Sequence, residues 1–81
     1  MNVVKDIKTM LENVNRVADF LVRNEGDLNA RIANSLHPEH TEFWEACLSH
    51  NHMRQVDNLN KQLRFKDALF KLTGRAGGVG E

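Results

Sequence analysis

The chain has 81 residues, of which 41% are hydrophobic and 27% are charged, and eleven basic residues balance eleven acidic ones. This length suits one small domain, and zero net charge argues against a general binder of polyanions. The apolar runs are too short for a membrane span or a signal peptide, so we expect neither membrane association nor export by that route. The single cysteine, Cys47, excludes an internal disulfide and fits a reducing, cytoplasmic compartment.

The N-terminal segment carries the clearest periodicity of the chain. Its apolar residues recur in alternating steps of four and three, which is typical of an amphipathic helix, and we expect a long one over residues 2–24. Gly26 can take the left-handed conformation that closes a helix, so Asn24, Glu25 and Gly26 are predicted to end it. The stripe consists of Val3, Ile7, Met10, Val14, Val17 and Leu21, widened by Val4, Leu11 and Ala18.

A short second helix is expected over residues 28–36, with Asp27 as its N-cap. His37 and Pro38 end it, because the residue before a proline disfavours the helical region. Pro38 is then suited to begin the next helix. Residues 49–52 are weak helix formers and leave two alternatives open: residues 38–73 form one long helix, or two with the second capped near Asp57.

The C-terminal segment has two apolar faces, and such a helix needs two neighbours. One neighbour is the N-terminal helix, and the other is the middle of the chain or a second molecule. We place Phe65, Leu69 and Leu72 at the interface with a second molecule. The opposite face contains Val56, Leu59, Leu63 and Phe70.

These elements predict an all-α fold. We expect a small bundle of three to four helices over residues 1–73, in which the long N-terminal helix packs against the C-terminal one. A core of this size is marginal, so dimerisation is expected to complete it. Residues 74–81 contain four glycines and are predicted to form a flexible tail.

Histidines and the cysteine gather in the middle of the chain and raise the question of a metal site. A zinc ion needs three or four converging ligands, and among the histidines and the cysteine on the helix expected from Pro38 onward only Cys47 and His50 have helical spacing. We expect no metal and no cofactor, and His40, Cys47 and His50 are weak candidates for a site shared across a dimer. Because Cys47 lies near Phe43 and Trp44, we interpret it as a small buried side chain and expect no enzymatic activity.

A helix-turn-helix over residues 28–48 is the main alternative, and it would make the protein a small DNA-binding regulator. Its second helix presents Glu39, Glu42 and Glu45, which would face the phosphates of DNA. Its turn contains Pro38 where a glycine is usual. Nucleic acid is therefore not the expected ligand.

The favoured interpretation is a non-enzymatic module that binds and modulates a larger protein and itself forms a homodimer. Phe43 and Trp44 are candidate anchors at its interface, because aromatic residues are enriched at interaction hot spots. An accessory inhibitor from a phage or a mobile element is one example of this class, suggested by size alone. A metal-dependent helical assembly is the second alternative.

Overall fold

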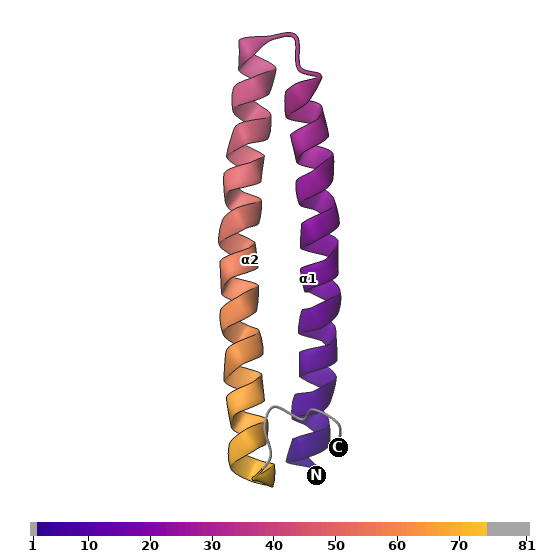
Figure 1. Cartoon of the computed structure of the whole chain (residues 1–81), viewed down its shortest axis with the longest axis vertical. Helices are drawn as coiled ribbons and strands as arrows, with labels where there is room; N and C mark the ends of the chain where they lie inside the picture. Colours follow the sequence, from indigo (N-terminus) through magenta and orange to yellow (C-terminus); the bar gives the residue numbers. More distant parts are fainter. Residues whose placement is uncertain (1, 75–81) are drawn as a thin grey trace.

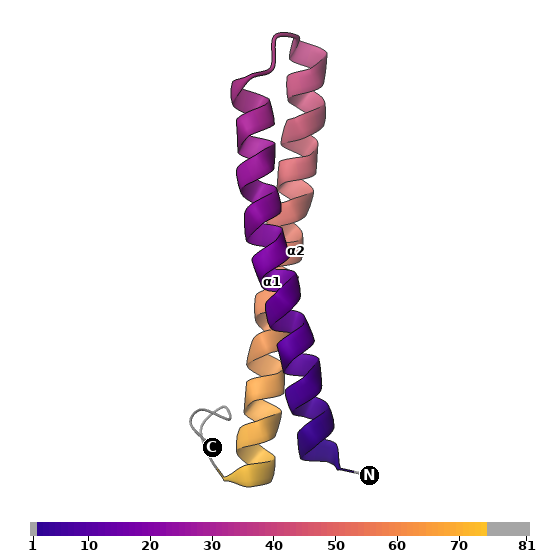
Figure 2. The same ribbon diagram turned by 90° about the vertical axis from the view of Figure 1, so that its right-hand side faces the viewer.

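The structure, a computed structural model, describes residues 2–74 and contains two long α-helices, α1 (Val3–Ala33) and α2 (Pro38–Thr73). They lie side by side and antiparallel, joined by a loop over residues 34–37 (Figure 1). The turned view shows that they cross near the middle of their length, so the molecule is a twisted rod of 54 × 21 × 16 Å (Figure 2). The prediction of an all-α fold is confirmed, although residues 2–74 form two helices rather than three or four. The predicted Gly-rich tail lies, from residue 75 onward, outside the described residues.

Local capping explains where the helices begin and end. The Asn2 side chain accepts a hydrogen bond from the Lys5 amide at 3.0 Å and caps α1. Pro38 occupies the first turn of α2, as predicted, where the missing amide hydrogen costs nothing. Gly74 ends α2 in the left-handed conformation, with φ 70°, and its amide donates to the Phe70 carbonyl at 2.7 Å.

The predicted end of the first helix at Gly26 is wrong, because α1 continues through it to Ala33. Consequently Asp27 is not an N-cap, and residues 28–36 are not a separate helix. Leu21 and Leu28 are seven residues apart on one face and are only 1% and 6% exposed. Burying a leucine stabilises the fold by about 1.5–3 kcal/mol, whereas a helical glycine costs about 1 kcal/mol. Continuing the helix is therefore the better solution.

The alternative left open for residues 38–73 is settled in favour of one helix, which runs through the weak helix formers at 49–52 without a break. Asn51, within this run, is 2% exposed and lies against α1. Its side chain donates hydrogen bonds to the Leu21 carbonyl and to the Asn24 side chain of α1. Tertiary contacts thus override the low helical propensity of the run.

The helices meet along a seam whose residues recur in steps of three and four on both sides, as in a coiled coil. On α1 the buried or half-buried seam positions are Val4, Ile7, Leu11, Val14, Ala18, Leu21, Glu25, Leu28 and Ile32. On α2 they are Trp44, Leu48, Asn51, Gln55, Asn58, Gln62, Phe65 and Leu69. The α1 side is apolar apart from Glu25 and the adjoining half-buried Asn24, whereas the middle of the α2 side is polar.

The seam uses the face of α2 that we had placed at an intermolecular interface. Leu69 is 1% exposed and Phe65 is half-buried against α1, while Leu72 remains 55% exposed. The opposite apolar face of α2 is exposed instead. The reason is register, because the steps of three and four that begin at Trp44 and Leu48 lead to Phe65 and Leu69.

Candidate interaction surfaces

Four amide side chains form the polar middle of the seam, and we call them the amide ladder: Asn51, Gln55, Asn58 and Gln62. The Asn51 amide nitrogen donates to the Leu21 carbonyl and to the Asn24 side-chain oxygen, both at 3.0 Å. Lower in the seam, the Asn58 nitrogen donates to the Val14 carbonyl at 2.9 Å. These bonds tie α2 to the backbone of α1 and specify which residues face each other.

The two glutamines complete the ladder along α2. Gln55 donates at 2.6 Å to both the Asn51 oxygen and Glu25, and Gln62 donates at 2.6 Å to the Asn58 oxygen. Within the described residues, no buried side-chain nitrogen or oxygen lacks a hydrogen-bond partner. The polar seam is therefore satisfied, which is the condition under which buried polar groups are tolerated.

Glu25 joins the ladder to the molecular surface. Its carboxylate accepts the bond from Gln55 and lies 3.3 Å from the His52 imidazole nitrogen. The hydrogen bond from Gln55, followed by that from His52, lowers the pKa of Glu25 below its ordinary value. The carboxylate is thus held in its charged form at the edge of the seam.

The polar middle of the seam leaves the hairpin little fully buried apolar core. In residues 2–74 only Leu21, Leu28 and Leu69 are fully buried hydrophobic side chains, whereas thirteen large hydrophobic side chains are more than 40% exposed. A lone pair of helices with so small a core is marginal in water. Exposed apolar side chains in such number indicate an interaction surface.

One row of exposed apolar side chains follows α2, and we call it the α2 stripe: Val56, Leu59, Leu63 and Phe70. These residues are 59%, 54%, 57% and 49% exposed. Val22 of α1 lies beside them, and a shallow hollow of about 370 Å³ is lined by Val22, Val56 and Leu59 together with part of the seam. Leu63 and Phe70 extend this apolar surface from the hollow toward the C-terminal end of α2.

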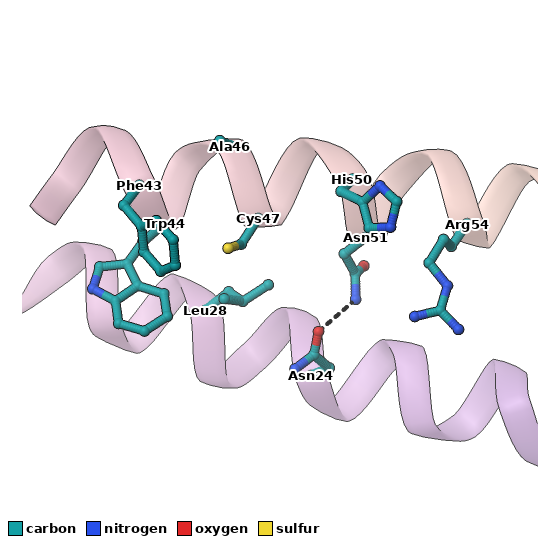
Figure 3. A pocket seen from close by; sticks show the side chains of 9 residues that line it. All are labelled: Asn24, Leu28, Phe43, Trp44, Ala46, Cys47, His50, Asn51 and Arg54. Carbon is teal, nitrogen blue, oxygen red and sulfur yellow. Dashed lines mark hydrogen bonds between the residues drawn. The ribbon is translucent and has the colours of Figure 1, made fainter.

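A groove runs along the other side of the hairpin, from the loop to the middle of α2. Three adjoining hollows of about 340, 470 and 100 Å³ form it, and Trp44 and Arg54 each line two of them. Figure 3 shows the middle hollow, where Trp44, Cys47 and Asn51 point from α2 toward α1 and Arg54 lies at the end away from the aromatic residues. We call this the basic groove, since its charged and imidazole side chains are Arg31, His37, His40, His50, Arg54 and Lys61, with Asp57 as the one acidic group.

The predicted aromatic anchors lie at this groove. The Phe43 and Trp44 rings meet edge to face with centroids 4.9 Å apart, and Phe43 is 59% exposed. Trp44 is half-buried against α1, where the Arg31 guanidinium lies 4.7 Å from the centre of its ring. The structure thus brings the two aromatic candidates together, and separates them from Phe65 and Leu69, which face the seam at the other end of the rod.

The metal candidates are dispersed. His40 lies at the loop end of the groove, while Cys47 and His50 line its middle hollow. No group of three or more His, Cys, Asp or Glu side chains within residues 2–74 could hold a metal ion. A site shared across a dimer stays the second alternative, with His40, Cys47 and His50 as its weak candidates.

The segment considered as a helix-turn-helix consists of the loop ends of α1 and α2. These helices pack antiparallel along their whole length, instead of crossing at the wide angle of that motif (Figure 1). Glu39, Glu42 and Glu45 are all exposed on α2. This end of the rod therefore presents acidic side chains together with the basic groove.

The amide ladder and Arg54 were not among the residues selected from sequence. One pattern could have identified the ladder: Asn51, Gln55, Asn58 and Gln62 continue the spacing between the apolar pairs on either side of them. Polar residues at such positions are known to specify register in coiled coils. Arg54 has no comparable pattern, because its role depends on the neighbouring helix.

Comparison with protein-family models, with curated proteins and with solved structures finds no match for this chain. Neither α1 nor α2 is long and apolar enough to cross a membrane.

Proposed function

We propose that this helical hairpin is a protein–protein interaction module, that it forms a homodimer through the α2 stripe, and that it acts by binding and modulating a larger protein. The observation that carries the proposal is the exposure of the stripe beside a seam whose middle is polar on the α2 side. A helix with one neighbour buries one apolar face, so a second apolar face on α2 indicates a second neighbour.

The energetics favour covering the stripe. Burying one side chain of this size completely gains about 1.5–3 kcal/mol, and each stripe residue has roughly half of its surface still to bury. Each would therefore contribute about 1 kcal/mol on docking. In a two-fold dimer both copies of each residue are buried, so the contribution of each is doubled. Two hairpins joined in this way form a four-helix bundle, whose core is far larger than that of either hairpin.

The pattern of the stripe fits an antiparallel pairing of two α2 helices about Leu59. With the two-fold axis there, Leu59 meets its own copy. Val56, three residues before Leu59, then lies within one residue of the position that faces Leu63, four residues after it, so the two side chains are neighbours across the interface. The same register brings Lys66 opposite His52, the partner of Glu25. Lys66 makes no ion pair within residues 2–74, so a second copy would supply the charge that complements it.

Sedimentation equilibrium at micromolar concentration tests the dimer. The wild-type chain is expected to sediment as a dimer and Leu59→Asp as a monomer, because the aspartate would place two carboxylates at the two-fold axis. Leu36→Asp is the matched control, since Leu36 lies in the loop and is 90% exposed. A wild-type chain that sediments as a monomer and melts cooperatively would refute the dimer.

Cysteine cross-linking in a Cys47→Ser background tests the register. A mixture of Val56→Cys and Leu63→Cys chains should form an intermolecular disulfide readily, whereas neither variant alone should do so. Efficient cross-linking of Val56→Cys to itself would indicate a parallel pairing and would contradict the proposed arrangement.

A further inference from the structure

We infer that the basic groove binds an acidic amphipathic helix of a protein partner. The inference deepens the proposed function, because it names the chemistry of the larger protein that the module would bind. The groove and the α2 stripe lie on different sides of the hairpin, since their hollows are lined by opposite edges of both helices. A dimer formed through the stripe leaves the groove open.

Charge is the first argument for an acidic partner. Three of the side chains that line the groove are Arg or Lys and three are His, against one carboxylate, Asp57, although the chain as a whole is neutral. Arg54 and Lys61 make no ion pair within residues 2–74. Carboxylates of a partner would therefore find cations whose charge is not already compensated.

The floor of the groove supplies the second argument. Leu28, Trp44 and Cys47 line the middle hollow, which at about 470 Å³ is large enough to receive apolar side chains of a partner. Figure 3 shows the Cys47 sulfur directed toward Leu28, with the Trp44 ring beside them and Arg54 at the far end. An occupant needs an apolar anchor with acidic groups next to it, which is the pattern of an amphipathic acidic segment.

The shape of the groove favours a helix. It runs between two antiparallel helices, and the span from His40 to Lys61 corresponds to about 32 Å at 1.5 Å per residue. A third helix of about six turns would lie in it as in a three-helix bundle, with anchors spaced by three and four residues. A small carboxylate amphiphile would occupy the middle hollow alone.

A titration monitored by the fluorescence of Trp44, the one tryptophan of the chain, tests the inference directly. The probes are 21-residue peptides without tryptophan. The first has a leucine face and a glutamate face, the second replaces each Glu with Lys, and the third scrambles the first so that its helical periodicity is lost. The first is expected to shift the emission of Trp44 and to saturate, and the other two are expected to bind at least tenfold more weakly.

Charge reversal locates the binding site. Arg54→Glu is expected to weaken binding of the acidic peptide at least tenfold, whereas Arg23→Glu, at an exposed arginine of α1 outside the groove, should change it less than twofold. Circular dichroism of both variants verifies that they are folded. Equal affinity of Arg54→Glu and wild type, or equal binding of the scrambled peptide, would overturn the inference. Saturable binding of decanoate without binding of the acidic peptide would also overturn it, in favour of a small amphiphile.

The same titration on Leu59→Asp separates this inference from the dimer. If binding of the acidic peptide persists in a monomeric chain, the groove functions independently of the stripe, as expected. If the wild type is a dimer but no acidic peptide binds, the groove inference fails and the dimer stands.

Discussion

Replacement of Asn51 by alanine is expected to remove most of the stability of the hairpin. Asn51 is 2% exposed and takes part in three hydrogen bonds, two donated to α1 and one accepted from Gln55. A buried hydrogen bond contributes about 0.5–1.5 kcal/mol net, so the three together contribute about 3 kcal/mol. A small domain has roughly 5 kcal/mol in total, so more than half of it would be lost.

Urea denaturation followed by circular dichroism measures the effect. All variants must be compared at one protein concentration, because dimerisation would couple to unfolding. Asn60→Ala is the matched control, since Asn60 is an exposed asparagine of α2, and it should change the stability by less than about 0.5 kcal/mol. A loss below about 0.5 kcal/mol in Asn51→Ala would refute the claim that the amide ladder joins the helices.

Asn51→Leu separates lost hydrogen bonds from a lost side chain. Leucine has the same branching at Cγ, although it is larger, and would bury apolar surface worth about 1.5–3 kcal/mol, which offsets most of the three hydrogen bonds. We expect it to be at least 1.5 kcal/mol more stable than Asn51→Ala in the same assay. Equal losses in the two variants would show that polarity itself is essential at this position.

The two glycines and the Gln55–Glu25 contact each allow a local test. Gly26→Ala should stabilise the fold by about 0.5–1 kcal/mol in urea denaturation, since nothing lies within 4 Å of the added Cβ and the glycine is helical; a loss would indicate contact there. Gly74→Ala should destabilise the end of α2 by about 1 kcal/mol, because its φ of 70° strains any L-residue; an unchanged melting temperature would contradict this. Gln55→Ala should raise the pKa of Glu25 toward its ordinary value, as followed by NMR titration. Because folding lowers the pKa of Glu25, its contribution to stability is present above the ordinary carboxyl pKa and is lost as the pH falls through the lowered pKa. A Glu25 titration that is identical in wild type and variant would exclude the Gln55 contact.

Sequence reasoning succeeded where the pattern was local. The amphipathic start of α1, the beginning of α2 at Pro38 and its end at Gly74 follow from periodicity, a proline and a glycine, and the structure has all three. It failed at Gly26, where a local stop signal competes with burial of Leu28 on a partner helix. That competition depends on tertiary packing, which the local sequence does not contain.

The assignment of the two faces of α2 could not be made by counting apolar residues. Both faces contain leucine and phenylalanine, and the face that meets α1 is interrupted by four amides. The acceptors that satisfy those amides, such as the Leu21 carbonyl, the Asn24 side chain and Glu25, lie on α1 and are not evident from the sequence of α2. The basic groove is likewise a product of two helices, so no single segment predicts it.

The antiparallel pairing of α1 and α2 also dictates an order of assembly. Residues joined across the seam are 27 and 30 positions apart near Asn51 but 44 apart at Asn58. Since the entropy cost of closing a loop rises with its length, each contact near the turn shortens the loop that the next one must close. The hairpin can therefore form from the turn outward. The pair Asn51 and Gln55 fixes the register of the helices first, and the pair Asn58 and Gln62 fixes it next. Leu69, buried at the open end, closes last, and an opening fluctuation that starts there exposes Phe65 and Leu69 while the groove around Trp44 stays intact.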